Sequence, residues 1–490
     1  MPGATRAQDL LLCTYRRHDD PMSLSKHRLV RLVMASLNDI EEWRLGDAAL
    51  ARAKGYPREY PAEVIDDWGI VFVDVVLDAV TGRPFCHEVN GPNAVGSDAL
   101  TGDSRARAES EARQALQRAR ERGYLDGDGR LLTPAVSVHA HQHWKAFRTG
   151  GEFFPRVEDF AELMDARLGG SPVCLRGAGE PLGDEMLSVV LGDVPAVARH
   201  LVVDPATQRL GYRGRPLIFA GNPNLLPELV RTRKVAAAGG RATDLDLRVF
   251  HAWRLVHLVH DKGRQQELLE GTGIEPLPYF EAASLEEARI CARALLAGGP
   301  VVVKPNGASG GTGVHVVVPG MTDAEISDRM EAVIADCVRK YGDNAEASAF
   351  PIRGFPFVRS TGYPMSDGDH LWDLRIAVQF EPGRAAVYPV TLRLAPRPFD
   401  PRSFHRDRDQ WISNVSGRQE TLLKSGMDDR ALAAVGLSPD RLEQIFRASV
   451  RWTMKAWDAS ARDGGRRSAV HEDACESDDR SFYPVDKFTP

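Results

Sequence analysis

The residues best suited to chemistry form a glycine-rich loop that follows an apolar strand. Residues 301–304 read Val-Val-Val-Lys, 305–313 read Pro-Asn-Gly-Ala-Ser-Gly-Gly-Thr-Gly, and 314–318 are again mostly apolar. Glycine lets backbone N–H groups approach phosphate oxygens, and the Lys304 ammonium adds a point charge. The pattern predicts a phosphate-binding flap between two strands, although a plain hairpin turn is the alternative. The residues expected at the phosphates are Lys304, Gly307, Ser309, Gly310, Gly311, Thr312 and Gly313.

The order of residues around this loop excludes two other phosphate-binding loops. A Walker A loop ends in Gly-Lys-Ser/Thr and opens a helix, whereas Gly313 is followed by Val314. A protein kinase places its glycine loop before the strand lysine, whereas Lys304 comes first here. The triplet His-Arg-Asp at 405–407 imitates a kinase catalytic loop, but residue 412 is isoleucine where that loop needs asparagine.

A second group of polar residues lies on a predicted hairpin near the N-terminus. Residues 69–77 are rich in β-branched side chains, 78–83 carry turn residues, and 84–90 form the expected return strand. Glu88 and Asn90 are two residues apart, so they share one face of that strand, and Asp74 can face them across the hairpin. The alternative is an ordinary hairpin with acidic residues on its solvated face.

The surrounding elements alternate between strand and helix, which is typical of an α/β protein. Residues 1–60 are predicted to be helical, and 104–122 form a charged, alanine-rich helix. Strands are expected at 135–138, 173–175, 201–203, 217–220, 300–304 and 315–318, and a long hairpin at 374–393. Helical stretches are expected at 246–270, 284–296, 323–340 and 439–457.

Composition restricts the class of protein. The chain has 490 residues, 43% hydrophobic and 27% charged, which indicates a globular protein of two to four domains or lobes. A net charge of −6 disfavours a broad nucleic-acid-binding surface, and no apolar run reaches the roughly 18 residues that span a bilayer. Six scattered cysteines without a C-x-x-C pair favour reduced thiols. We therefore expect a cytoplasmic protein without a secretory signal.

From about residue 246 to 420, the sequence resembles the ATP-grasp superfamily, which includes D-alanine–D-alanine ligase, biotin carboxylase and peptide-forming carboxylate–amine ligases. The motifs that carry the resemblance are Asp261-Lys262, 273–278, the Lys304 loop, 355–359, Asp373-Leu374-Arg375, Arg393 and 412–417. The resemblance implies that Lys262 and Lys304 contact the nucleotide and that Phe357 and Val358 lie at its adenine. It also implies roles in phosphoryl transfer for Arg375 and Arg393, and a site position for Asn414.

The family pattern breaks after Gly417, because nothing between 418 and 490 resembles the metal-binding hairpin that normally ends the fold. The hairpin at 69–92 does resemble it. We therefore expect a circular permutation, which chain termini near each other at the surface make tolerable. By this resemblance, Asp74, Glu88 and Asn90 bind Mg²⁺ or Mn²⁺, and Mg²⁺ prefers hard oxygen ligands.

The resemblance implies an α/β protein with ATP-grasp lobes and a small pre-grasp domain. Its activity would be that of an ATP-dependent, ADP-forming ligase that joins a carboxylate to an amine through an acyl phosphate. The substrates would be amino acids or peptides, as in secondary metabolism. Open alternatives are a phosphotransferase, a thiol or carrier-protein ligase, and a non-catalytic nucleotide-binding regulator. We expect no nucleic-acid or membrane partner, and a homodimer stays open.

Five divisions of the chain follow from these expectations. Residues 1–100 complete the catalytic lobe, 101–245 form the pre-grasp domain, and 246–360 form the ATP-binding lobe. Residues 361–460 form the catalytic lobe with its closing helix, and 461–490 are an expected disordered tail.

Three histidines form a separate candidate group. His139, His141 and His143 alternate, so on a strand they would share one face. A zinc site would need a fourth ligand, and the same face could instead line a substrate cleft or have a structural role. They stay candidate substrate residues.

Overall fold

The computed structural model describes residues 49–91, 104–141, 153–204, 209–221, 261–306, 311–342, 350–413, 422–425 and 428–463, with a few single positions between 225 and 259. The chain divides into two compact units. Unit 1 contains the described residues within 1–53, 66–70 and 95–253, and unit 2 those within 54–65, 71–94 and 254–490. Both units combine helices with β-sheet, so the expected α/β class is confirmed.

Unit 1 is built on a six-stranded sheet in the order β5-β6-β4-β9-β8-β7. The strands are β4 (Ala135–His141), β5 (Val173–Gly177), β6 (Leu187–Asp193), β7 (Leu201–Val203), β8 (Leu210–Tyr212) and β9 (Arg215–Ala220). Strands β5, β6, β4 and β9 run parallel, whereas β7, β8 and β9 pair antiparallel. The helices are α4 (Ser104–Glu121), α6 (Phe153–Arg167) and α7 (Val194–His200).

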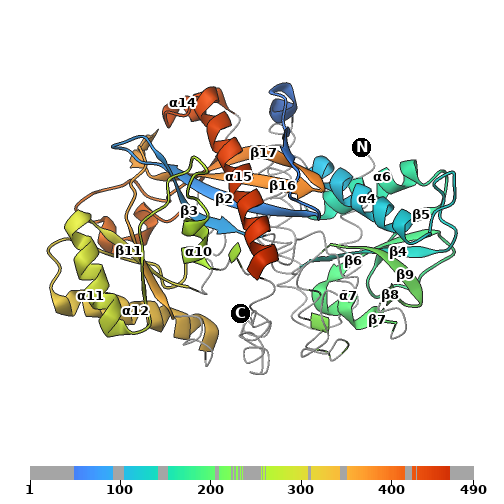
Figure 1. The fold of residues 1–490 in the computed structure, drawn as a ribbon, viewed down its shortest axis with the longest axis horizontal. Coiled ribbons are helices and arrows are strands. Elements are labelled where there is room, and N and C mark those ends of the chain that lie inside the picture. The colour runs from blue at the N-terminus through green and yellow to red at the C-terminus, as the bar shows by residue number, and fades with distance from the viewer. Residues whose placement is uncertain are drawn as a thin grey trace. The chain divides into compact units, whose positions relative to one another are not determined.

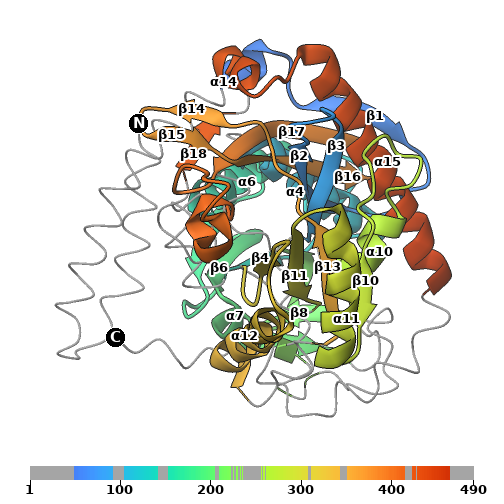
Figure 2. The ribbon, with the colours of Figure 1, turned by 90° about the vertical axis from the view of Figure 1, so that its left-hand side faces the viewer.

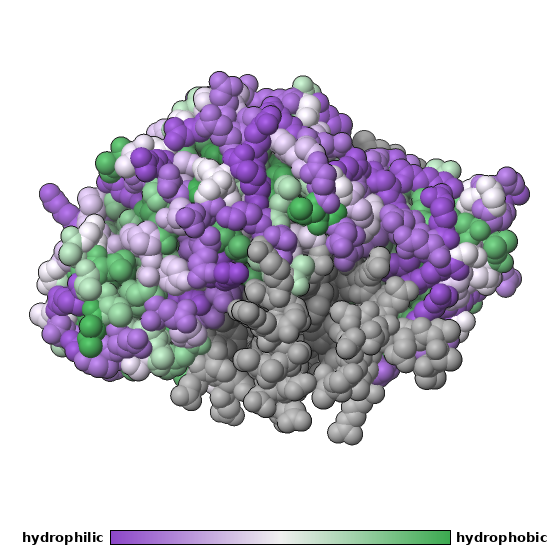
Figure 3. Space-filling view, in the orientation of Figure 1, coloured by the Kyte–Doolittle hydropathy of each residue, from purple (hydrophilic) through white to green (hydrophobic). Residues whose placement is uncertain are grey.

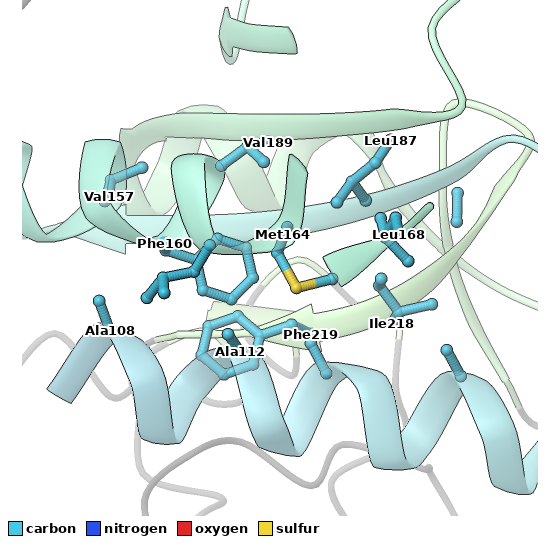
Figure 4. Close-up of a cluster of buried hydrophobic side chains, with 14 of the residues drawn as sticks. Ala108, Ala112, Val157, Phe160, Met164, Leu168, Leu187, Val189, Ile218 and Phe219 are labelled. Atoms are coloured by element: carbon cyan, nitrogen blue, oxygen red, sulfur yellow. The ribbon is translucent and has the colours of Figure 1, made fainter. Parts of the chain in front are cut away.

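The two faces of this sheet carry separate apolar cores, because alternate strand residues point to opposite faces. Leu187 and Val189 join a cluster with α4 and α6 residues, whereas Val190 joins another with α7. Figure 4 shows Phe160, Met164 and Phe219 gathered beside the alanines of α4. The small alanine side chains let the helix pack closely on the sheet and fix its position.

Unit 2 contains a six-stranded sheet in which the N-terminal hairpin lies beside a much later one (Figure 1). Its strands are β1 (Arg58–Ala62), β2 (Gly69–Leu77), β3 (Pro84–Asn90), β16 (Trp372–Glu381), β17 (Gly383–Leu394) and β18 (Leu422–Ser425). The order is β1-β17-β16-β2-β3, and β18 also pairs with β17. Strand β2 is buried along its whole length, which its β-branched sequence favours.

A smaller four-stranded sheet of unit 2 carries the glycine-rich loop, in the order β10-β13-β11-β12. Its strands are β10 (Phe280–Ala282), β11 (Val301–Pro305), β12 (His315–Val317) and β13 (Ile352–Pro356). Helices α11 (Leu285–Leu295) and α12 (Asp323–Tyr341) share a buried core with this sheet. A short hairpin consists of β14 (Tyr363–Met365) and β15 (Gly368–His370), and 3₁₀ turns lie at η1 (Leu296–Gly298), η3 (Phe404–Arg406) and η4 (Arg408–Gln410).

Among its described residues, unit 2 also has the helices α10 (Lys262–Glu267), α14 (Asp429–Ala434) and α15 (Pro439–Asp463). Figure 2 shows α15 beside α10, and the Trp452 indole N–H donates to the Gln265 carbonyl at 3.1 Å. Trp457 of α15 also lies edge-on to Phe380 of β16, with ring centroids 5.5 Å apart. The helix therefore ties α10 to the larger sheet.

On the face seen in Figure 3, hydrophilic residues predominate, and hydrophobic residues lie in small separate groups. Among the described residues, no helix is both long and apolar enough to cross a membrane.

Most predicted elements within the described residues are confirmed, including both strands of the hairpin at 69–90 and the hairpin at 374–393. The prediction of a helical 1–60 is wrong at its end, because 58–62 form β1, which pairs with β17. Of the helical stretch at 246–270, the structure has α10, and most of 246–260 lies outside the described residues. Residues 461–463 of the predicted tail belong to α15, and the rest lies outside the described residues.

Candidate active site

The hairpin of β2 and β3 presents its polar residues by register. Asp74 pairs directly with Glu88, and Phe72 with Asn90. The next pair joins Val75 to Cys86, so β3 has one extra residue, His87, at a β-bulge. A bulge redirects side chains and leaves backbone groups outside the ladder. Here the His87 carbonyl accepts a hydrogen bond from the Lys304 ammonium at 3.1 Å, which joins the hairpin to β11.

A network of four buried charges lies beside the hairpin. The Arg375 guanidinium donates two hydrogen bonds to Asp74, with Nε–Oδ1 at 2.7 Å and Nη2–Oδ2 at 2.6 Å. Arg393 forms a similar fork on Asp373, at 2.6 and 2.7 Å, and also reaches Asp74 Oδ2 at 2.9 Å. Although burial raises it, the two guanidinium groups hold the pKa of Asp74 below its usual value. The two guanidinium groups therefore favour the ionised form of the Asp74 carboxylate.

Two neutral side chains complete the hydrogen bonding of these carboxylates. The Asn90 amide donates to Asp74 Oδ2 at 2.8 Å, and the Ser413 hydroxyl donates to Asp373 Oδ2 at 2.5 Å. Both oxygens of Asp74 thus accept hydrogen bonds from arginine, and one also accepts from asparagine. The side chain of Glu88, by contrast, is 36% exposed and lies 3.8 Å from the Lys262 ammonium.

These contacts test whether the predicted ligands fit a hard cation. The Glu88 carboxylate and the amide oxygen of Asn90 fit, because neither accepts a hydrogen bond in the network above. Asp74 fits poorly, because both of its oxygens already face N–H groups. Among the described residues, no group of three or more His, Cys, Asp and Glu side chains could hold a metal ion. Any cation here would need oxygen ligands beyond carboxylates.

Two lysines converge on β3 from the glycine-loop side. The Lys304 ammonium lies 4.4 Å from the centre of the Phe355 ring, and burial lowers its pKa to about 8. The Lys262 ammonium donates to the Asn306 carbonyl at 3.0 Å, immediately before the loop. The two predicted nucleotide lysines therefore lie at the same strand, 42 residues apart in the sequence.

Helix α10 holds this arrangement through two buried glutamines that sequence analysis missed. Gln265 accepts from the Val89 N–H and donates to the Val89 carbonyl, both at 2.9 Å. Gln266 donates to the Cys86 carbonyl at 3.0 Å. Their amides continue the hydrogen bonding of the β3 edge, so α10 positions Lys262 beside Glu88. Adjacent glutamines in a short helix carry no sequence signal for this role.

The second half of the glycine loop is described, whereas Gly307, Ser309 and Gly310 lie outside the described residues. Gly311 and Gly313 have φ of 72° and 66°, which favours glycine. A Cβ on Gly313 would also lie 3.1 Å from the Val333 carbonyl oxygen. Thr312 lies half-buried between them. The loop joins β11 to β12, which pair antiparallel, so the predicted strand–loop–strand order is confirmed.

Phe357 and Val358 follow β13 and are half-buried. The Phe357 ring lies 5.0 Å from Phe404, 6.0 Å from Trp411 and 6.3 Å from Phe399, measured between ring centroids. This aromatic group lies at the end of the strand that pairs with β11. Its planar faces are suited to stacking.

The candidate histidines divide between packing and positions that the structure does not describe. His139 on β4 is fully buried, with its ring 4.5 Å from Phe160 and 4.9 Å from Phe219. Its Nε2 lies 3.0 Å from the Ser137 hydroxyl, and burial places its pKa well below the usual value. The His139 side chain is thus packed in the apolar core of unit 1. His141 ends the same strand, and His143 and Asn414 lie outside the described residues.

No protein-family model matches the chain, and no curated protein matches it in sequence. Among solved structures, it is similar to a putative gamma-glutamylcysteine synthetase from Methylobacillus flagellatus KT, with 11% identity, coverage of 90% of this chain and 96% of that chain, and a TM-score of 0.42. It is also similar to a glutathione synthetase-like effector from Globodera pallida, with 11% identity, coverage of 76% of this chain and 84% of that chain, and a TM-score of 0.36. A third similar structure is D-alanyl-alanine synthetase A from Vibrio cholerae, with 10% identity, coverage of 66% of this chain and 82% of that chain, and a TM-score of 0.33.

Proposed function

We propose that the protein is an ATP-dependent, ADP-forming ligase that joins a carboxylate to an amine at a site on unit 2. The observation that carries the proposal is the convergence of cationic side chains around the β2–β3 hairpin. Lys304 and Lys262 reach β3 from the glycine-loop side, while Arg375 and Arg393 hold Asp74 on β2. Phosphoryl transfer relies on this kind of charge stabilisation.

Glu88 and Asn90 are the residues that would hold a magnesium ion in this site. Mg²⁺ commonly takes one or two carboxylates and completes its octahedron with phosphate oxygens and water. When bound, the ion supplies charge neutralisation to the phosphates. Asp74, the third predicted ligand, is assigned to the arginines instead, because its oxygens accept their N–H groups.

The side chains of the protein act in this reaction by position and charge. Arg375 and Arg393 use Nε and Nη2 to bind the aspartates, so the N–H groups of Nη1 stay outside those bonds and can face an anion. A substrate carboxylate oxygen bonds to the γ-phosphorus as ADP leaves. An amine nitrogen then bonds to the acyl carbon, phosphate leaves, and the amine loses a proton. No protein nucleophile is required.

The proposal includes the ATP-grasp fold with a circular permutation. It is supported by the position of β2 between β3 and β16 in one sheet, although the two hairpins lie at opposite parts of the sequence. It is also supported by the Lys304 contact with His87. By analogy with the family, the substrates are amino acids or peptides.

The test is an ADP-release assay with pools of carboxylates and amines. Full turnover should need one member of each pool, and hydroxylamine in place of the amine should trap the acyl phosphate as a hydroxamate. Glu88→Gln should lower turnover at least tenfold, by loss of a metal ligand. Glu331→Gln, an exposed change on α12, is the matched control and should leave turnover unchanged.

Two results would count against the proposal. If no pool supports nucleotide turnover and Glu88→Gln leaves ATP affinity unchanged, the ligase function is wrong. If ADP forms with a thiol or an alcohol but never with an amine, the reaction belongs to the thiol ligase or phosphotransferase class instead.

A further inference from the structure

The segment 396–413 follows β17 and contains the triplet His-Arg-Asp that does not serve as a kinase loop. It is held in shape by its own hydrogen bonds. The Gln410 amide accepts from the Asp400 N–H at 2.9 Å and donates to the Ser403 hydroxyl at 3.1 Å. The Arg397 N–H donates to the Asp409 carbonyl at 2.9 Å. These hydrogen bonds fix the backbone of the segment, and thereby the positions from which its side chains extend.

One of these side chains, Arg408, reaches the glycine-rich loop. Its Nη2 donates to the Gly311 carbonyl, and its Nη1 donates to Asp336 of α12 at 3.3 Å. Asp336 also lies 3.1 Å from Nε2 of His315, at the start of β12. Gly311 lies in the second half of the loop, and His315 follows four residues later at the start of β12. Arg408 and Asp336 together therefore fasten that half to α12.

The same segment contacts the end of β13. Phe404 lies 5.0 Å from Phe357 between ring centroids, and Phe404 is buried. The His405 carbonyl accepts from Arg329 of α12 at 3.3 Å. One short stretch thus contacts the glycine-rich loop, α12 and Phe357 beside β13.

We propose that Arg408 is a positioning residue for nucleotide binding, which holds the second half of the glycine loop in place for phosphate. This inference rests on the proposed function of the site. Arg408 acts through the Gly311 backbone, so its loss should weaken ATP binding without removing any group from the reacting atoms. The effect should appear in ATP affinity and only slightly in turnover at saturating ATP.

The test compares Arg408→Gln, Arg408→Lys and the control Arg402→Gln, an exposed change in the same segment. Two measurements are made, the Kd for ATP by calorimetry and hydrogen exchange of the amides at 311–318 without nucleotide. Arg408→Gln should raise Kd about tenfold, as expected for a lost charge-assisted hydrogen bond, and speed exchange. Arg408→Lys should show smaller changes in both Kd and exchange than Arg408→Gln, because lysine keeps one charged donor. Arg402→Gln should match the wild type.

Wild-type Kd and exchange in Arg408→Gln would overturn the inference, and so would a fall in turnover with an unchanged Kd. If the wild type binds no ATP, the proposed function fails separately, while the exchange measurement still decides whether Arg408 positions the loop. Circular dichroism of each variant distinguishes loss of the loop contact from loss of the fold.

Discussion

Two buried ionic clusters, one in each unit, differ in how closely their charges pair. In unit 2, Asp74 and Asp373 accept forked hydrogen bonds from Arg375 and Arg393 at 2.6–2.7 Å. In unit 1, the fully buried Glu111 of α4 lies 3.4 Å from Nε of Arg107, 3.6 Å from Nε of Arg156 and 3.9 Å from Nδ1 of His139.

The difference follows from the elements that carry the charges. Asp373 and Arg393 are directly opposed on β16 and β17, where register brings side chains within about 5.5 Å at Cβ. Glu111 instead meets side chains from two helices and a strand, whose approach depends on packing. In this pair the strand register brings the two side chains within reach of a fork. The tighter cluster is the one in the proposed active site.

The largest expected effect comes from breaking the tighter cluster. Asp74→Asn should lower the free energy of unfolding by about 3–5 kcal/mol, because it leaves buried arginine charge without its carboxylate. Urea denaturation measures this change. The control is Asp328→Asn, an exposed residue on α12 that should stay near the wild type. A loss below about 1 kcal/mol would mean that Arg375 and Arg393 find other partners.

The looser cluster should respond less. Glu111→Gln keeps the side-chain volume and removes one buried charge from pairs at 3.4–3.9 Å. We expect a loss of about 1–3 kcal/mol in the same urea experiment. A loss equal to or above that of Asp74→Asn would contradict the comparison, since pairing distance would then not rank the clusters.

Acid should weaken the unit 1 cluster first. His139 has a pKa well below its usual value, mainly because of burial and then because of Arg156. Below about pH 6.5 the His139 imidazole binds a proton in the unfolded chain but not in the folded chain. The stability contributed by neutral His139 is therefore complete above pH 6.5 and falls as pH decreases, by up to about 1.4 kcal/mol per unit.

Urea midpoints at pH 7.5, 6.5 and 5.5 measure this slope, and His139→Phe should reduce it, since phenylalanine does not titrate. Asp74, whose pKa is also lowered, follows the same sign in a more acidic window: the stability that it contributes is complete above its ordinary pKa of 3.8 and falls as the pH drops below that value. Equal slopes for the wild type and His139→Phe would contradict the prediction, because they would show that the pKa of His139 is the same in the folded and unfolded protein.

The smallest effect should come from the rim of the tighter cluster. Ser413→Ala removes the hydroxyl that donates to Asp373 at 2.5 Å while Arg393 keeps its fork. We expect a loss of about 1 kcal/mol, seen as a shift of a few degrees in Tm. A loss near that of Asp74→Asn would place Ser413 among the essential partners of the network.

Local patterns predicted the elements best, because their information lies within a few residues. The β-branched run at 69–77 and the turn after it specify β2 and β3 with their observed bounds. Strand β13 was missed, since its five residues include Gly354 and Pro356 and it is defined by pairing with β11. Strand β1 was missed for a similar reason.

The site could be predicted in its residue types but not in its pairing. Motif order selected Lys262, Lys304 and Glu88, and these lie together at β3. The bonds of Asp74 to Arg375 could not be read from spacing, because register across β2 and β16 decides them. The reach of Arg408 to Gly311 likewise depends on a fold of the chain 97 residues later.

The bond between Asp74 and Arg375 joins residues 301 positions apart, and this distance affects folding during synthesis. A ribosome adds roughly 5–20 residues per second, so the β2–β3 hairpin emerges about 15–60 s before β16 exists. During that time the apolar strand β2 has one unpaired edge and an isolated carboxylate. Each nascent chain therefore has an open strand edge that can pair with other chains. Correct folding depends on keeping this edge of β2 covered until the hairpin of β16 and β17 has been synthesised.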